Sequence, residues 1–343
     1  MPTATSSQSP TKPRSVWPDG TGRDSAREQP FVFAAGITYF GRMTVLPTES
    51  HSEDRGLLDI LFEKVESLSD SRHFHQKHAD LIRSYRHYEH ALAQNGSKAF
   101  YTHAFCYYCQ RPQALKVDYL YSRTVNGVAI PNWREWLVCS TCKLNNRMRA
   151  AYHFVATKAR TQDTPRIYVS EESTHLYRKF SDRFEHLTGS EFLGTNVPLG
   201  HIDTRKIRNE DATRLTFGDA SFDLYLSFDV FEHIPDYTGA LQEAFRVLKP
   251  EGALIFTVPF HAGSDEHVVR ATVNSDGSIN YLLPQEFHGD PLRQEGALCY
   301  YHFGWQLLRD LGAAGFKESA AYFYLSQRYG YLGGPAMIFC AEK

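Results

Sequence analysis

The sequence predicts an α/β fold with a parallel sheet in its C-terminal half, preceded by a helical region and a cysteine-rich module. From about residue 166 onward, apolar strand-like segments alternate with amphipathic helical segments, which is typical of a parallel sheet with helical crossovers. Two Cys-x-x-Cys pairs lie upstream of this alternation. We therefore expect a disordered tail (1–30), a strand and helical N-terminal region (31–100), a cysteine module with a linking helix (101–160) and an α/β domain (161–343).

Length and composition exclude several classes of protein. The 343 residues are 42% apolar, and such a length corresponds to about two domains. Six cysteines are too few for a disulfide-stapled chain, and a net charge of −2 argues against a chain devoted to nucleic acid. No apolar run reaches the about 18 residues of a membrane span, and the N-terminal residues lack a secretory signal. We expect a soluble cytoplasmic protein, with no indication of its oligomeric state.

The N-terminal region shows two kinds of pattern. Residues 31–46 carry β-branched and aromatic residues in loose alternation, which suggests a short hairpin or strand. Residues 53–94 turn helical, with Ser52 as a plausible cap of the first helix. The apolar positions that recur at helical spacing are Leu57, Leu58, Ile60, Leu61, Val65 and Leu68 in the first helix and Leu81, Ile82, Tyr85, Tyr88 and Leu92 in the second.

The two cysteine pairs, Cys106/Cys109 and Cys139/Cys142, predict a zinc site. Two intervening residues let both sulfurs of a pair point to one side of a tight turn, and two such turns can close a tetrahedron about Zn²⁺. Strand-like segments at 114–121 and 136–138 and a turn at 126–127 are typical of a zinc ribbon. A disulfide pair or a redox Cys-x-x-Cys is the alternative. Four thiolate ligands leave no open position, so the zinc would be structural.

The alternation after residue 166 places the strands and helices of the α/β domain. The helix expected at 237–248 ends at the segment Lys-Pro-Glu-Gly (249–252), because proline cannot continue a helix and glycine supplies the turn. The expected strands are 166–170, 187–193, 222–228, 253–259 and 336–340, and the expected helices are 174–184, 237–248 and 305–311.

One block within this half resembles a known family. Residues 209–260 read NEDATRLTFGDASFDLYLSFDVFEHIPDYTGALQEAFRVLKPEGALIFTVPF, which resembles class I S-adenosylmethionine (SAM)-dependent methyltransferases. The resemblance covers about 165–343 and implies a Rossmann-like, seven-stranded methyltransferase sheet, SAM as cofactor and a transferase of class EC 2.1.1. The segments EFHGDP, YYHFGW and GYLGGPAMIFCAEK are similar to a bacterial methyltransferase-11-like subgroup often preceded by a cysteine module.

The resemblance also implies which acids hold the cofactor. Asp211 and Ala212 would lie beside the adenine, and Asp229 would lie near the methionine end. Glu191 best matches the acid at the end of the second strand, because two carboxylate oxygens suit a ribose diol. An exposed loop residue is the alternative for Glu191.

The first loop departs from the family pattern. The family's glycine-rich loop is replaced by Ser170-Glu-Glu-Ser-Thr-His175, and bulkier residues force the backbone onto another path. Either Ser173 or Thr174 caps the next helix, whose free N–H groups then receive the methionine carboxylate, or the cofactor site has decayed. Ser170, Glu171, Ser173 and Thr174 are therefore candidate cofactor contacts.

Histidines after the strands are candidate bases for deprotonating a hydroxyl acceptor. In an open α/β sheet, ligands bind at the carboxyl ends of the strands, and a histidine near neutrality suits a base. His288 or His261 is the preferred base, with Asp290 orienting the substrate hydroxyl or the imidazole. His233 may serve only to position its loop, and His302 is a weaker candidate; a structural role is the alternative for each.

Three functions are compatible with these patterns. The leading one is SAM-dependent O-methylation of a small-molecule or sugar acceptor. The second is RNA methylation, in which residues 101–165, with nine Lys/Arg against three acids, grip nucleic acid; net acidity elsewhere weakens it. The third is a non-catalytic methyltransferase-like scaffold in which zinc holds a partner-binding surface.

Overall fold

The computed structural model describes residues 59–93, 98–159 and 164–343, and the contacts of residues 55–343 make them one compact unit. The predictions for 1–30, for 31–46 and for the Ser52 cap lie outside the described residues. Of the predicted domain boundaries, those near 100 and 160 remain predictions. Within the described residues, no helix has the length and apolar character needed to cross a membrane.

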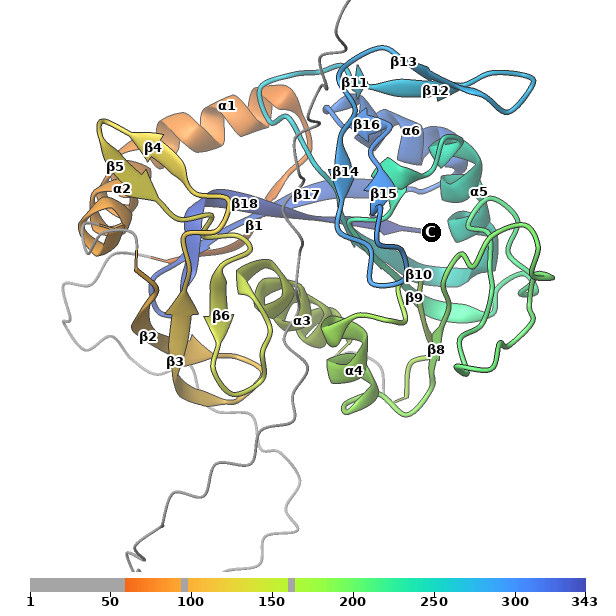
Figure 1. Cartoon of the computed structure of the whole chain (residues 1–343), viewed down its shortest axis with the longest axis horizontal. Coiled ribbons are helices and arrows are strands. Elements are labelled where there is room, and N and C mark those ends of the chain that lie inside the picture. The colour runs from red at the N-terminus through yellow and green to blue at the C-terminus, as the bar shows by residue number, and fades with distance from the viewer. Residues whose placement is uncertain (1–58, 94–97, 160–163) are drawn as a thin grey trace, which may run out of the picture. The chain divides into compact units, whose positions relative to one another are not determined.

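A seven-stranded sheet organises the described residues (Figure 1). Its strand order is β1-β17-β18-β10-β9-β7-β8. The strands β10, β9, β7 and β8 pair with one another in parallel. The pairs β10–β18, β18–β17 and β17–β1 are antiparallel. The strands are β1 (Ile60–Val65), β7 (Ile167–Val169), β8 (Leu187–Gly189), β9 (Phe222–Phe228), β10 (Leu248–Thr257), β17 (Glu318–Ser326) and β18 (Tyr331–Glu342).

Helices connect the parallel strands as expected for a Rossmann-like sheet. α4 (His175–Ser181) links β7 to β8, and α5 (Tyr237–Val247) links β9 to β10. The two connections move in opposite directions along the sheet, so right-handed crossovers place α4 and α5 on opposite faces. α6 (Gln306–Ala314) packs beside α5 and ends at Gly315, whose φ of +114° requires a residue without a Cβ.

Two predicted elements need correction. The segment around Ile60–Val65, predicted as helix, is strand β1 at the edge of the sheet, where it pairs antiparallel with β17. The helix begins only after Ser67, whose side chain accepts a hydrogen bond from the Asp70 N–H. The predicted break at 249–252 is a bulge inside β10, with Glu251 at a φ of +63°. The sequence analysis did not predict β17.

Two helices follow β1, α1 (Leu68–Lys77) and α2 (Ala79–Ala93). The predicted apolar face of α2 is confirmed in part, because Ile82 and Tyr85 are buried. Glu89 is buried on the same helix and accepts hydrogen bonds from the N–H groups of Gly333 and Gly334. α2 therefore packs against the beginning of β18, whereas α1 contacts β1 and α2.

The cysteine module is a small antiparallel sheet. Its strands β2 (Phe100–Cys106), β3 (Arg111–Val117) and β6 (Leu137–Cys139) lie in the order β2-β3-β6. The predicted turn at Asn126-Gly127 is confirmed: both residues have positive φ and join β4 (Arg123–Val125) to β5 (Val128–Ile130). The linking helix α3 (Asn146–Lys158) contacts α4 and β18, as Figure 1 shows for α3 and α4.

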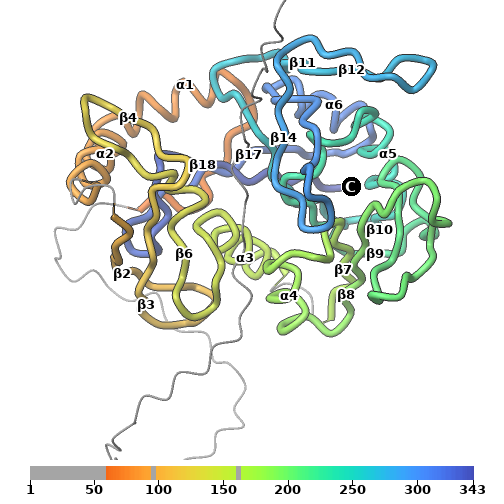
Figure 2. The backbone as a smooth tube through the Cα atoms, in the orientation of Figure 1, coloured from red at the N-terminus to blue at the C-terminus, as the bar shows by residue number. Residues whose placement is uncertain are grey.

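A long connection between β10 and α6 carries short two-stranded ribbons, and Figure 2 shows its path near the ends of β9 and β10. The pairs are β11-β16, β12-β13 and β14-β15. Their bounds are β11 (Val268–Val269), β12 (Ala271–Val273), β13 (Ile279–Tyr281), β14 (Phe287–His288), β15 (Ala297–Leu298) and β16 (Tyr301–His302).

Candidate functional site

Glu191 and Asp211 lie at the same edge of the sheet, beyond the carboxyl end of β8. Glu191 follows β8, and its N–H and carbonyl bond to Arg208 and Glu210 of a neighbouring parallel segment. Asp211 continues that segment, and its Oδ1 accepts hydrogen bonds from the N–H and hydroxyl of Thr213. The backbone bridge between Glu191 and Asn209 thus brings the segment that carries Asp211 beside Glu191, and the cofactor contacts of both acids remain predictions.

Burial changes the acidity of the carboxyls beside this edge. The pKa of Glu191 is raised to about 7, mainly because its side chain is largely removed from water, although the Ser173 N–H donates to its Oε1 at 2.6 Å. Burial, with the charge of Glu191 nearby, also raises the pKa of Glu171 well above its usual range. Burial therefore weakens the acidity of both carboxyls at this edge.

The loop after β7 contains buried polar atoms suited to a polar ligand. Among the described residues, no hydrogen-bond partner is found for Glu171 Oε1, Glu172 Oε2 and Ser173 Oγ. Unpaired buried polar atoms are costly, and a ligand with hydroxyl and amino groups would satisfy them. These donors and acceptors fit the adenosyl and methionine groups of SAM.

The other predicted contacts of this loop have local partners. Thr174 caps α4 as predicted, because its hydroxyl accepts from the Tyr177 N–H, and the binding of the methionine carboxylate at this helix remains a prediction. The Ser170 hydroxyl lies within hydrogen-bond distance of the Glu171 carboxyl and of the Ser227 hydroxyl. Ala212 packs, partly buried, against the core.

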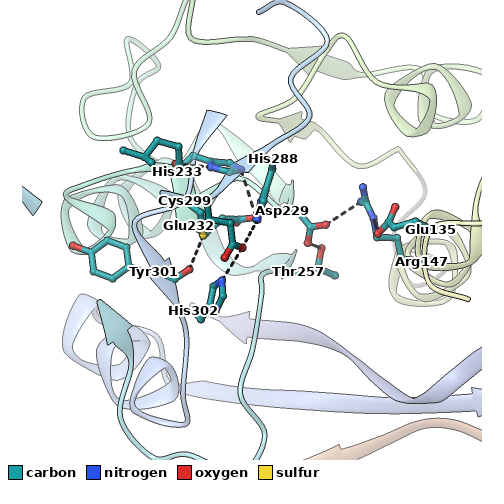
Figure 3. Close-up of polar contacts among 12 residues, drawn as sticks. Glu135, Arg147, Asp229, Glu232, His233, Thr257, His288, Cys299, Tyr301 and His302 are labelled. Atoms are coloured by element: carbon teal, nitrogen blue, oxygen red, sulfur yellow. Dashed lines mark hydrogen bonds and ion pairs between the residues drawn. The ribbon is translucent and has the colours of Figure 1, made fainter. Parts of the chain in front are cut away.

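Asp229 follows β9 and joins the sheet to the cysteine module (Figure 3). Its two oxygens accept hydrogen bonds from Arg134 at 2.8 and 2.7 Å and from the Thr257 hydroxyl at 2.8 Å, and Arg147 lies 3.3 Å away. Burial alone would raise the pKa of Asp229, but the two guanidinium charges outweigh it and hold the pKa well below the usual range. The predicted role of Asp229 at the methionine end remains a prediction, because its oxygens already face these partners.

A second group of titratable side chains lies past the ends of β9 and β10. Glu232 and His233 belong to η2 (Phe231–His233), and His288 belongs to β14 (Figure 3). Nε2 of His233 and Nδ1 of His288 lie 3.6 and 3.5 Å from Oε1 of Glu232. The neighbouring Cys299 thiol and then the Glu232 carboxylate raise the pKa of His288 to about 11. These neighbours favour the charged imidazole as long as no cation lies beside Glu232.

Glu286 connects this group to the other predicted histidines. Its Oε1 accepts from Nε2 of His288 at 3.0 Å and from Nε2 of His302 at 2.9 Å, and Arg270 lies 3.0 Å from Oε2. His261 is exposed, and its Nε2 lies 3.2 Å from Nδ1 of His302. The structure thus brings the four candidate histidines into one network.

Asp290 lies apart from the imidazoles that it was predicted to orient. Its Oδ1 accepts hydrogen bonds from the N–H groups of Leu292 and Arg293. The Arg293 side chain donates to the carbonyl of Phe192, just beyond Glu191. The connection carrying Asp290 therefore reaches the Glu191 end of the sheet, and a substrate contact of Asp290 remains a prediction.

The four cysteines predicted as zinc ligands meet in one cluster. Their Sγ atoms all lie within 4.8 Å of one another, with Cys106 and Cys142 at 3.7 Å and Cys109 and Cys139 at 3.9 Å. A tetrahedron with zinc–sulfur bonds of about 2.3 Å has edges of about 3.8 Å, whereas a disulfide is about 2.05 Å long. The residues fit a tetrahedral zinc ion, and the four thiols are free.

Sequence reasoning missed several residues of these groups. Arg134 and Arg147 were counted only as positive charge, and nothing in the sequence pairs them with Asp229. Glu232 stands next to a predicted histidine, so a search for ligands around His233 could have found it. Glu286 precedes His288 by two residues and offered the same signal.

Comparisons with known proteins find methyltransferases among the proteins that resemble part of this chain. Residues 175–256 match the family model described as "Methyltransferase domain". A demethylmenaquinone methyltransferase of Staphylococcus epidermidis is 35% identical over 74 residues, which cover 20% of this chain and 31% of that protein. The chain thus spans about a third of the length of this curated relative.

Solved structures with a similar arrangement include two methyltransferases. An S-adenosylmethionine-dependent methyltransferase from Mesorhizobium loti is 14% identical at a TM-score of 0.35, covering 57% of this chain and 100% of its own. The 1,6-didemethyltoxoflavin-N1-methyltransferase of Burkholderia thailandensis is 18% identical at a TM-score of 0.33, covering 57% and 77%. The segment that matches the methyltransferase model carries Glu191, Asp211 and Asp229.

Proposed function

We propose that this protein is a SAM-dependent methyltransferase that methylates a hydroxyl of a small molecule or sugar. The observation that carries the proposal is the meeting of Glu191 and Asp211 at one edge of the sheet, inside the segment that matches a methyltransferase domain. Glu191 would accept hydrogen bonds from the ribose hydroxyls, and Asp211 would accept one from the adenine amino group.

The reaction is a displacement at a methyl carbon. SAM supplies the methyl group on a sulfonium, and its carbon–sulfur bond breaks as the acceptor oxygen bonds to the carbon, so that the bond's electron pair stays on sulfur. The acceptor hydroxyl loses its proton to a base of this chain. The protein must therefore align the acceptor and hold a base beside it.

His261 is the better of the two preferred bases. Both ring nitrogens of His288 already face glutamates, Glu232 at 3.5 Å and Glu286 at 3.0 Å. His261 follows β10 and is exposed, with a ring contact to His302. A solvent-accessible imidazole of this kind can take the acceptor proton and release it to water.

The cysteine cluster is proposed to hold a structural Zn²⁺. Its contacts disfavour the RNA-binding alternative: Arg149 is fully buried and donates to backbone carbonyls, and Arg134 and Arg147 pair with Glu135 and Asp229. These three arginines already have partners within the protein. The net positive charge of residues 101–165 is therefore larger than the charge available to bind a phosphate backbone.

Calorimetric titration of the purified chain with SAM tests the proposal. We expect micromolar or tighter binding, and at least tenfold weaker binding by Asp211→Ala with an unchanged far-UV spectrum, because one adenine contact is lost. Asp219→Ala, which removes an exposed acid paired with Arg246, is the matched control and should bind like the wild type. Wild-type protein that shows no heat with SAM would instead support the scaffold alternative.

The acceptor is found by activity. Incubating the enzyme and methyl-labelled SAM with fractions of a cell extract should transfer label to a small-molecule or glycan fraction. Label that appears in RNA would overturn the proposed acceptor class while leaving the methyltransferase assignment in place.

A further inference from the structure

We propose that Glu232, His233 and His288 form a second metal site, which binds a divalent transition-metal ion of the Zn²⁺ type through one carboxylate and two imidazoles. This site is separate from the four cysteines, which the sequence itself indicates. The proposal stands on three observations: the spacing of the ligand atoms, the hydrogen bonds that hold the two imidazoles, and the burial of the carboxylate.

The spacing fits ligands around one ion. Oε1 of Glu232 lies 3.6 Å from Nε2 of His233 and 3.5 Å from Nδ1 of His288, and the ligand atoms all lie within 4.8 Å of one another. An N–H···O hydrogen bond is normally 2.7–3.2 Å long, so these contacts are too long for a good one. A tetrahedral ion with bonds of about 2.1 Å separates its ligand atoms by about 3.4 Å.

The far nitrogen of each imidazole is held by an acceptor. Nδ1 of His233 donates to the carbonyl of Leu298 at 2.8 Å, and Nε2 of His288 donates to Glu286 at 3.0 Å. In a neutral imidazole that donates from one nitrogen, the other carries a lone pair. Here both lone pairs would be directed toward Glu232. Metal-binding histidines show this arrangement, in which a carbonyl or carboxylate orients the ring.

Glu232 supplies the independent sign of a missing cation. Its side chain is 0% exposed, and among the described residues neither carboxylate oxygen has a hydrogen-bond partner. A buried carboxylate whose only charged neighbours in the described part of the chain are imidazoles at 3.5 and 3.6 Å is unfavourable, and a bound cation would remove this cost. The backbone of Glu232 is meanwhile fixed, because its carbonyl accepts from the Tyr300 N–H at 2.7 Å.

The neighbouring trio of Glu286, Cys299 and His302 is a weaker candidate. Glu286 already accepts from two imidazoles and pairs with Arg270, and the Cys299 thiol donates to the Tyr301 carbonyl. Glu286 therefore acts as the carboxylate that positions His288, and the positive charge of Arg270 neutralises Glu286.

Three protein ligands leave a tetrahedral ion one open position. Zinc sites with two histidines and one glutamate are catalytic in other enzymes because a water or substrate oxygen takes that position. If the proposed function holds, the acceptor hydroxyl would occupy it, and the ion would lower the pKa of that hydroxyl. This role rests on the proposed function, whereas the metal site itself does not.

Metal content tests the site without reference to activity. After chelation and reconstitution with Zn²⁺, mass spectrometry should find two ions per wild-type chain and one in Glu232→Gln and in His288→Gln. His175→Gln, which alters an exposed histidine on α4, is the matched control and should keep two. Glu232→Gln should fold at least as well as the metal-free wild type, because it removes an unpaired buried charge.

Cobalt substitution separates the two sites. Co²⁺ bound by cysteines absorbs strongly in the near ultraviolet through sulfur-to-metal charge transfer, whereas a site of imidazole and carboxylate shows only weak visible bands. We expect the weak bands to disappear in Glu232→Gln and the strong band to persist.

Two outcomes would overturn the site: a wild-type chain that holds one ion, or a second ion that Glu232→Gln retains. A chain that does not bind SAM but still holds the second ion would refute the proposed function and leave the metal site standing. The failure of one proposal can therefore be told from the failure of the other.

Discussion

Acidic side chains lie beyond the C-terminal ends of the parallel strands, and their surroundings give them different pKa values. Burial raises the pKa of Glu171 well above its usual range and that of Glu191 to about 7. Asp229 is also removed from water, but two arginines stabilise its charge and lower its pKa. Carboxyls in one part of the molecule therefore differ in acidity because their neighbours differ.

The pKa of Glu191 predicts a pH-dependent affinity for SAM. Ionised Glu191 is the better acceptor for two ribose hydroxyls, and its pKa is raised to about 7. Affinity should therefore be full above pH 7 and fall by up to about tenfold per unit below it. Calorimetry from pH 6 to 8.5 measures this, and Glu191→Gln should give a flatter, weaker profile. Identical pH profiles for the two proteins would exclude Glu191 from cofactor binding.

Ion pairs between elements join the cysteine module to the sheet. The contact is made by Arg134 after β5, Arg147 in α3 and Asp229 after β9. Asp229 has a φ of +58°, a conformation that asparagine and aspartate tolerate better than other side chains. The pair is partly buried, since the side chains of Arg147 and Asp229 are 19% and 15% exposed.

Asp229→Asn should therefore lower the free energy of unfolding by about 2–3 kcal/mol, less than the loss of a fully buried pair, because Arg134 and Arg147 are left to share the single charge of Glu135. Asparagine keeps the shape and suits the backbone, so the loss reports charge. Asp118→Asn, which breaks the exposed pair with Lys116, is the control and should cost less than about 1 kcal/mol. Urea denaturation measures both, and equal small effects would refute a stabilising role of the Asp229 contact.

At the scale of the whole molecule, the cysteine module and the sheet share one core. Arg149 of α3 donates to the carbonyls of Tyr329 and Gly330 in the turn before β18, and the Phe105 N–H donates to the Arg328 carbonyl. The connection between β17 and β18 is therefore held by the module. Loss of the module's structure should weaken the sheet as well.

Cys106→Ser should accordingly lose the structural zinc and lower the melting temperature of the chain in a single transition, because metal binding is coupled to folding. A loss of roughly 10 °C or more is expected, and a chelator should produce a similar shift in the wild type. Cys340→Ser, a buried cysteine outside the cluster, is the control and should keep its zinc content. An unchanged melting curve for Cys106→Ser would reject a structural metal.

The local sequence pattern was enough to predict several strands and helices of the α/β half. β9 spans the predicted 222–228, and Thr174 caps the predicted helix, because a buried apolar run and a side-chain cap act over neighbouring residues. The four cysteines were likewise found from spacing alone. Such signals are local, so a single sequence carries them.

Long-range packing decided the rest. Residues 60–65 have helical spacing, yet they form β1 because β17, some 260 positions along the chain, offers them an open sheet edge. Glu232, His233, Glu286 and His288 meet only because the connection after β10 folds back over the end of β9. The spacing of residues along the chain predicts contacts between near neighbours in the sequence. Contacts between distant segments depend on the free energy of the whole packed structure, which no local pattern contains.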